Sequence, residues 1–493
     1  MNRVVVIGAG MAGMCAAARL QRMGHSVTVF EASDTYGGKC RSETIDGFTF
    51  DAGPTLLTIP AVYRDFFQRT GKHMAQVLTI EPVDPSFDYR FADGSAVRFA
   101  NLSRKKTVSA ISQAFGEKSA QEWDRALIQA EAMWDVSREP FIEHEISVKS
   151  FITPRFLRDL FTIAPWKSLR SLGLSDSRLQ MIMDRYATYS GSDPRKAPAV
   201  LSTIAFIEEA FGAWHVQGGM GKLAQAVYQR CLDLGVTFEF STRVTKVLID
   251  AGAATGVSLS DGRTVGAENI VANCDASLLY NQMIDPSLAK GERKKLSKAE
   301  PSFAGFSIFL GLKKSDISLA HHTVLFPRDY DQEFDDLFTH KRPCSDPTIY
   351  ICAPNDPTMA PDENHEGYSI LVNAPRHGDV DWSNRDFVES YAKKIIDTIE
   401  SRGIPIRSRC VIQEIRTPLD LHNATNAPGG SIYGTSSNGA RSAFLRAKNR
   451  SPIKNLFLAG GSAHPGGGLP LVGLSAEMVA EAIGSRTGRP KGH

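Results

Sequence analysis

The first thirty residues alternate between short apolar runs and one longer segment of small and apolar residues. Val4 to Ile7 is a continuous apolar run, typical of a buried strand. Met11 to Met23 is rich in small and apolar side chains and is followed by Gly24, so it predicts a helix with a glycine stop. Val27 to Phe30 is a second apolar run. The pattern therefore predicts a strand, a helix and a parallel strand at the start of the chain.

The turn between the first strand and the helix has the G-x-G-x-x-G pattern. A first glycine allows a tight turn, a second lets a pyrophosphate approach the backbone, and a third lets helix and strand pack closely. The helix N-terminus offers unpaired N–H groups to phosphates. Glu31 ends the second strand about twenty residues later, where a carboxylate can accept hydrogen bonds from ribose hydroxyls. The stretch predicts a dinucleotide site, with these turn residues: Gly8, Ala9, Gly10, Met11, Ala12 and Gly13.

The rest of the chain predicts an α/β protein, α+β overall, with two further kinds of segment. Thr107 to Ala210 is helical in pattern and carries three tryptophans. Short apolar runs elsewhere predict strands, including a hairpin at Asp261-Gly262. The predicted strands are Val236–Phe240, Val244–Ile249, Ala254–Leu259, Ile270–Ala272, Phe303–Leu312, Thr348–Cys352, Tyr368–Val372 and Leu456–Ala459.

Composition narrows the class of protein. A length of 493 residues is enough for two or three domains. The formal charge of +2, without a basic run, gives no case for nucleic acid. Seven scattered cysteines, without C-x-x-C spacing, predict a reduced cytoplasmic protein and no metal site. No apolar run reaches the length of a membrane span.

Two further motifs carry a resemblance to a known family. Gly37-Gly38-Lys39 and Asp51-Ala52-Gly53-Pro54 follow Glu31 and resemble the entry to the FAD site in flavin amine oxidases, protoporphyrinogen oxidases and carotenoid desaturases. The segment NLFLAGGSAHPGGGLPLVGLSAEMVAEAI near the C-terminus predicts a strand, a glycine-rich loop and a helix from about Leu471. It resembles the C-terminal signature of bacterial-type phytoene desaturases and carotenoid 3,4-desaturases. The chain is thus similar to FAD-dependent carotenoid desaturases.

The resemblance implies a discontinuous Rossmann-type FAD-binding domain (1–75, 215–295 and 415–493). It also implies a substrate-binding sheet domain (76–106 and 296–414) and a helical insertion (107–214). The ADP half of FAD would lie against the glycine turn, Glu31 and Ala32, with Val244 at the adenine. Gly38 and Lys39 would lie near the pyrophosphate, and Gly53 and Pro54 near the flavin. Gly460 and Gly461 would bind the pyrophosphate and ribityl chain, with Leu471 and Val472 against the pyrimidine edge of the ring.

The helical insertion contains a stretch in which aromatic and basic residues recur at helical spacing. It includes Phe151, Arg155, Phe156, Leu157, Arg158, Leu160, Phe161, Trp166, Lys167 and Arg170. Such a segment suits a bilayer interface, and a helix facing the core with a solvated basic face fits the spacing equally. Because the resemblance implies a substrate dissolved in membrane, we expect peripheral membrane contact.

The function implied is desaturation of an acyclic carotenoid by hydride transfer to flavin N5, with oxygen or a quinone as electron acceptor. Candidate catalytic residues are His464, Glu208, Glu209 and His215. The structural alternatives are a solvated helix face for the two glutamates and a loop residue satisfied by backbone for His464. A flavin amine oxidase, a polyene isomerase and an oxidase of terminal methyl groups in apocarotenoids remain alternative functions.

Overall fold

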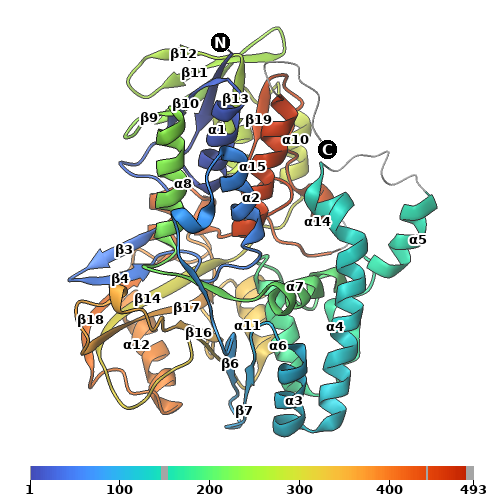
Figure 1. Cartoon of the computed structure of the whole chain (residues 1–493), viewed down its shortest axis with the longest axis vertical. Helices are drawn as coiled ribbons and strands as arrows, with labels where there is room; N and C mark the ends of the chain where they lie inside the picture. Colours follow the sequence, from blue (N-terminus) through green and yellow to red (C-terminus); the bar gives the residue numbers. More distant parts are fainter. Residues whose placement is uncertain (1, 146–153, 440–441, 485–493) are drawn as a thin grey trace.

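A parallel five-stranded sheet gathers strands from the two ends and the middle of the chain (Figure 1). The computed structural model describes residues 2–145, 154–439 and 442–484. The strand order is β19-β13-β1-β2-β9, and every neighbouring pair is parallel. The strands are β1 (Arg3–Ile7), β2 (Ser26–Phe30), β9 (Thr237–Glu239), β13 (Asn269–Ala272) and β19 (Leu456–Leu458).

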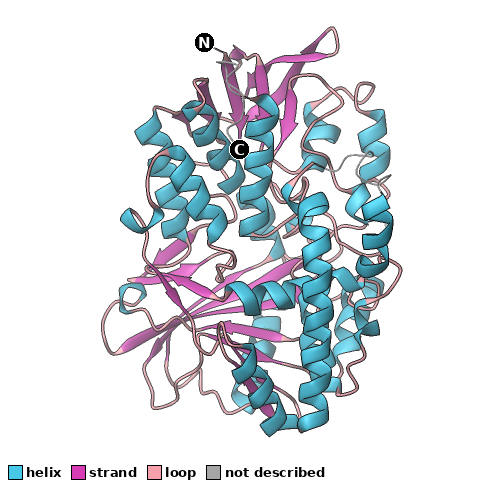
Figure 2. Ribbon diagram, turned by 45° about the vertical axis from the view of Figure 1, so that its right-hand side comes forward, coloured by secondary structure: helices cyan, strands magenta, loops and turns pink. Residues whose placement is uncertain are grey.

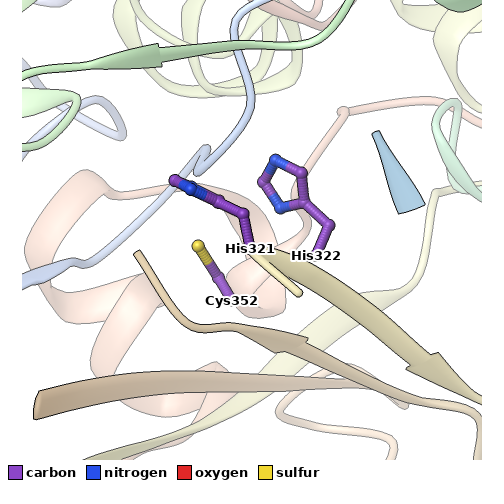
Figure 3. A group of neighbouring side chains, drawn as sticks. All are labelled: His321, His322 and Cys352. Atoms are coloured by element: carbon purple, nitrogen blue, oxygen red, sulfur yellow. The ribbon is translucent and has the colours of Figure 1, made fainter. Parts of the chain in front are cut away.

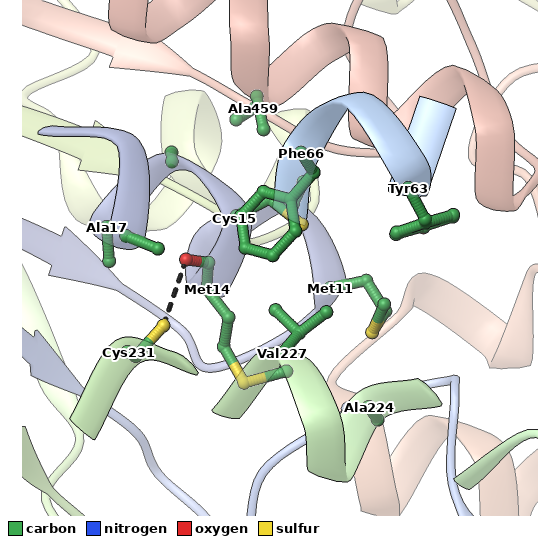
Figure 4. Close-up of a cluster of buried hydrophobic side chains, with 14 of the residues drawn as sticks. Met11, Met14, Cys15, Ala17, Tyr63, Phe66, Ala224, Val227, Cys231 and Ala459 are labelled. Atoms are coloured by element: carbon green, nitrogen blue, oxygen red, sulfur yellow. Dashed lines mark hydrogen bonds between the residues drawn. The ribbon is translucent and has the colours of Figure 1, made fainter. Parts of the chain in front are cut away.

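Both faces of this sheet are covered, which explains why its strands read as continuous apolar runs. On one face, α1 (Met11–Arg22) packs against α8 (Gly221–Leu234), α15 (Leu469–Ile483) and α2 (Ala61–Thr70). Figure 4 shows the contact of α1 with α8 and α2, where the Cys231 thiol donates to the Met14 carbonyl at 3.2 Å. The other face packs on a three-stranded antiparallel sheet of β10 (Val244–Asp250), β11 (Ala253–Leu259) and β12 (Thr264–Gly266).

A second, seven-stranded sheet lies at the opposite end of the molecule (Figure 1). Its order is β18-β14-β17-β16-β15-β6-β7, and all neighbours are antiparallel except β15 and β6. Helix α12 (Arg385–Ser401) packs on it. The strands are β6 (Phe87–Arg90), β7 (Ala96–Phe99), β14 (Ala304–Lys313), β15 (His322–Leu325), β16 (Ile349–Cys352), β17 (His365–Ala374) and β18 (Cys410–Arg416).

The helical insertion packs on the β6–β7 end of this second sheet, around the buried indole of Trp123 (Figures 1 and 2). Two short antiparallel pairs lie between the sheets: β3 (Ser42–Ile45) with β4 (Phe48–Asp51), and β5 (Ile80–Pro82) with β8 (Trp214–Val216). The insertion contains α3 (Arg104–Phe115), α4 (Glu117–Arg138), α5 (Pro154–Ile163), α6 (Ser177–Thr188) and α7 (Thr203–Phe211). The remaining helices are α9 (Ala276–Leu278), α10 (Lys290–Leu296), α11 (Tyr330–Phe334), α13 (Pro418–Thr425) and α14 (Ser442–Leu445).

The predicted fold class is confirmed, and each predicted strand is present within a few residues of its expected ends. The hairpin at Asp261-Gly262 joins β11 to β12, and the C-terminal helix begins at Leu469. The sequence did not predict β6, β7, β15 and β18, which complete the second sheet. The domain limits stay a prediction, because strand pairing does not define where each domain ends.

Candidate active site

The glycine turn after β1 is held in place by Glu31. One carboxylate oxygen of Glu31 accepts the Ala9 N–H at 2.7 Å, and the other accepts the Ser33 N–H at 2.8 Å. The Oε2 atom that accepts the Ala9 N–H keeps a second lone pair for a ribose hydroxyl, whereas Oε1 also accepts the Ser33 hydroxyl at 3.0 Å. A Cβ atom at Gly13 would lie 2.2 Å from the Gly8 carbonyl oxygen, so only glycine allows α1 to pack this close to the turn. Both features fit the ADP half of FAD.

The N-terminus of α1 is open to an anion. Its N-cap is Gly10, which has no side chain to accept the first N–H groups of the helix. Such groups need a partner, and a phosphate suits both their hydrogen bonds and the helix dipole. Because α1 is fixed on three sides by α2, α8 and α15, its N-terminus is a rigid binding element.

Asn273, for which no role was predicted, links the glycine turn to the C-terminal loop. It follows β13, its N–H donates to the Ile7 carbonyl at 2.8 Å, and its amide donates to the Ala459 carbonyl at 2.7 Å. A Cβ atom at Gly10 would lie 2.6 Å from its Oδ1, and one at Gly460 would lie 2.7 Å from its Nδ2. The Asn273 side chain therefore explains why both loops need glycine.

The second predicted motif lies beside the first. Gly10 and Gly37 form a parallel bridge, and a Cβ atom at Gly53 would lie 1.8 Å from the Lys39 carbonyl oxygen. The Lys39 ammonium donates to the carbonyl oxygens of Ser431 and Ile432, both at 2.8 Å. Burial lowers the pKa of Lys39 to about 8. The ammonium has a third donor for a ligand.

The C-terminal glycine loop is held by the buried Ser475 hydroxyl, which accepts the Gly460 N–H and donates to the His464 carbonyl. Leu471 and Val472 lie in the first turn of α15, and the Val472 N–H donates to the Gly468 carbonyl at 3.0 Å. Val244 begins β10, with its side chain buried. The assignment of each of these residues to a part of FAD stays a prediction.

Among the candidate catalytic residues, Glu208 is fully buried and does not lie on a solvated face. It accepts hydrogen bonds from the hydroxyls of Tyr186 at 2.7 Å and Tyr189 at 3.0 Å. Burial raises its pKa, and the nearby Arg185 guanidinium opposes the rise. Glu209 is 3.9 Å from Arg104, and burial raises its pKa to about 7.

The two candidate histidines each have a defined partner. His215 Nε2 lies 2.9 Å from an Asp356 carboxylate oxygen, in β8 between the two sheets. His464 Nε2 lies 2.9 Å from the His144 carbonyl, which agrees with the alternative of a loop histidine bonded to backbone. The structure does not bring the four candidates to one point: His464 belongs to the C-terminal loop, Glu208 and Glu209 to α7 and His215 to β8. Their catalytic roles stay predictions.

A further polar group, which the sequence did not predict, lies where β15 begins and β16 ends in the second sheet (Figure 3). It consists of His321, His322 and Cys352, which we call the histidine–cysteine cluster. The Tyr350 hydroxyl lies 2.7 Å from His322 Nδ1 and 2.7 Å from the Thr55 hydroxyl. Because Thr55 follows Pro54, the cluster is linked directly to the loop predicted to touch the flavin.

Part of the aromatic and basic stretch is exposed. The Phe161 side chain is 76% exposed and Trp166 is 58% exposed, with their rings 5.9 Å apart. Arg170 instead forms ion pairs with Asp184 and Asp331. The predictions for the side chains of Phe151, Arg155, Phe156, Leu157 and Arg158 lie outside the described residues. In the part of the chain that the structure describes, no helix combines the length and apolarity needed to cross a bilayer.

Comparison with known proteins gives consistent matches. The sequence pattern of the flavin containing amine oxidoreductases matches residues 11–344. A zeta-carotene-forming phytoene desaturase from Myxococcus xanthus is 32% identical over 98% of this chain and 94% of its own length. A 4,4'-diapolycopene oxygenase from Methylomonas sp is 31% identical over 98% of both chains. Cyclohexylamine oxidase from Brevibacterium oxydans has the same fold, with a TM-score of 0.66, 15% identity and coverage of 99% and 100%.

The chain belongs to the flavin-containing amine oxidoreductase family, within which its relatives are carotenoid desaturases and oxygenases. It is an FAD-dependent oxidoreductase. The glycine turn, Glu31 and the open end of α1 fit this cofactor.

Proposed function

We propose that the protein desaturates an acyclic carotenoid or a related polyene, as a phytoene desaturase or a carotenoid 3,4-desaturase. Bound FAD supplies the hydride acceptor of such a reaction, flavin N5. A proton leaves the neighbouring carbon, and oxygen or a membrane quinone would take up the electrons. The observation that carries the proposal is the similarity to a phytoene desaturase over nearly the full length of both chains.

The charges near the predicted flavin loop also support an uncharged substrate. The carboxylate of Glu208 balances Arg185, whose guanidinium lies 4.5 Å above the Phe87 ring. His215 is paired with Asp356. Paired charges and aromatic rings suit contact with an uncharged polyene.

Positioning accounts for most of the proposed catalysis. Loss of hydride from a conjugated chain leaves an allylic cation, from which a proton departs without a strong base. Holding the chain against the flavin is worth about 7–11 kcal/mol of the barrier. The hydrogen bond between Thr55 and Tyr350 joins the loop next to the predicted flavin site to β16, so it would fix one wall of this site.

Membrane contact is part of the proposal. Phe161 and Trp166 present exposed aromatic rings beside the exposed cation of Lys167. Aromatic rings and cations together suit the headgroup region of an anionic bilayer. A polyene could then enter from the membrane.

A second candidate is oxidation of a terminal methyl group, which the similarity to a 4,4'-diapolycopene oxygenase favours. The test is anaerobic incubation of the purified yellow protein with liposomes carrying phytoene, neurosporene, hydroxylated acyclic carotenoids or C30 analogues. Flavin bleaching with a two-hydrogen mass loss is the expected result. An oxygen-containing product, formed once air is admitted, would identify the oxidase instead. Bleaching by amines but by no polyene would refute both.

A further inference from the structure

The histidine–cysteine cluster brings three metal-ligand side chains together at the start of β15, which His321 directly precedes, and at the end of β16. One ligand atom from each of His321, His322 and Cys352 lies within 4.8 Å of the others (Figure 3). His322 and Cys352 are directly opposite each other in the β15–β16 register. Because Cys352 is far from the two histidines in the sequence, no C-x-x-C or similar spacing predicts this cluster.

Both imidazole rings of this cluster keep a nitrogen for a ligand, and the Cys352 thiol is hydrogen-bonded to Tyr350 and Thr55. The Nε2 atoms of His321 and His322 are buried and, among the described residues, have no hydrogen-bond partner. Leaving a buried polar group unsatisfied costs about 1–3 kcal/mol. A metal ion that coordinates these nitrogens would remove this cost.

An outer layer of hydrogen bonds orients His322. Tyr350 Oη lies 2.7 Å from its Nδ1, and Thr55 in turn bonds to Tyr350. A partner on one ring nitrogen fixes the tautomer and leaves the other nitrogen free to coordinate. Such partners are typical of metal-binding histidines.

One carboxylate is linked to the cluster through His215. The His215 ring centroid lies 4.8 Å from that of His321, and His215 Nε2 lies 2.9 Å from an Asp356 carboxylate oxygen.

We propose that His321, His322 and Cys352 form a binding site for a borderline-soft divalent transition metal, for which Zn²⁺ is the probe. Two imidazoles and a thiolate are a common donor set for such ions, and a three-ligand site keeps a fourth position for water or a small ligand. Binding exchanges the Cys352 thiol proton for the metal and releases that proton to solvent. The ion would hold β15 and β16 together next to the flavin loop. This site does not depend on which substrate the enzyme oxidises.

The test measures zinc bound to the purified holoenzyme after dialysis against Zn²⁺ buffered by a weak chelator. We expect about one zinc per chain, with release of protons on binding. Cys352→Ser and His322→Gln should reduce bound zinc to the background level. Cys410→Ser, which changes a thiol on β18 outside the cluster, should retain it. Tyr350→Phe should weaken zinc binding about 10- to 100-fold.

Flavin content of each variant reports whether it has folded. If Cys352→Ser or His322→Gln loses flavin, Co²⁺ binding to the unchanged protein replaces them as the test. Tetrahedral Co²⁺ with a thiolate ligand absorbs at longer wavelength than oxidised flavin, so we expect new bands there. No zinc above background in the unchanged protein, equal zinc in the folded variants, or Co²⁺ without these bands would overturn the proposal.

Discussion

At the scale of single residues, close contacts with neighbouring groups explain why the flavin site contains glycines. Asn273 lies so close to Gly10 and Gly460 that a Cβ atom at either position would collide with its amide. A Cβ atom at Gly13 would likewise collide with the Gly8 carbonyl oxygen. The loops therefore approach each other through glycine.

Replacing Glu31 tests the ribose assignment. Glu31→Ala removes the acceptor of the Ala9 and Ser33 N–H groups and the predicted acceptor of the ribose hydroxyls. A hydrogen bond to a charged acceptor is worth about 1.5–3 kcal/mol, so the Kd for FAD should rise about tenfold or more. FAD occupancy after purification, read from the flavin absorbance per chain, measures the effect.

Glu239→Ala is the matched control, because Glu239 is a carboxylate on the neighbouring strand β9 that pairs with Arg263 at the surface. Its FAD occupancy should equal that of the unchanged protein. Full occupancy in Glu31→Ala would show that this carboxylate does not hold the ribose.

The residues that sequence could identify are those whose signal is local. The glycine turn and Glu31 lie within one strand–helix–strand unit, so their spacing already defines a site. Asn273 and His322 depend on contacts between residues more than two hundred positions apart in the sequence. Asn273 contacts Gly10, and His322 is linked to Thr55 through Tyr350. Only the position of Asn273, directly after a predicted strand, was a usable signal.

At the scale of elements, α5 and the loop after it present an apolar surface that the fold does not cover. Phe161 and Trp166 are exposed, whereas Ile163 and Ala164 between them are buried. The element therefore has an inner face that fixes it and an outer face that is free for contact. The spacing of aromatic and basic residues alone could not distinguish this element from a helix that packs on the core.

The double variant Phe161→Ser/Trp166→Ser tests whether this face binds membrane. Burying one large aromatic side chain is worth about 1.5–3 kcal/mol, so losing two should lower the liposome partition coefficient at least about tenfold. Co-sedimentation with anionic liposomes measures this coefficient. Leu232→Ser/Val411→Ser removes exposed apolar side chains elsewhere and should leave it unchanged. Equal loss of liposome binding in both variants would show that the membrane contact is not specific to Phe161 and Trp166. No loss in either variant would show that these two side chains do not bind the membrane.

The second sheet shows the limit of element prediction. Phe303–Leu312 and Tyr368–Val372 were predicted because their apolar runs are long, and they are its central strands β14 and β17. β15 is only four residues long and begins with a buried histidine, so its polar start hid it. β6 and β7 were missed although Phe87, Tyr89 and Phe99 bury their rings against the helical insertion.

At the scale of the whole molecule, one sheet is built from three separated segments, and the predicted cofactor contacts come from all three, with Val244 of β10 as the contact of the middle segment. β1 and β2 belong to the first, β9 and β13 to the middle, and β19 to the last segment. A ligand that touches all three segments binds only when the sheet is assembled. FAD should therefore stabilise the folded state as a unit.

Removal of FAD should thus lower the Tm of the main unfolding transition, and added FAD should restore it. At a free concentration about 1,000 times the Kd, the cofactor adds about 4 kcal/mol to the free energy of unfolding. Calorimetry at increasing FAD concentration measures the shift. Riboflavin at the same concentrations is the control, because it lacks the ADP half that the glycine turn and Glu31 are predicted to bind, so it should raise the Tm far less. If riboflavin stabilised the protein as well as FAD does, the binding energy would come from the flavin half of the cofactor, and the glycine turn and Glu31 would have no part in it.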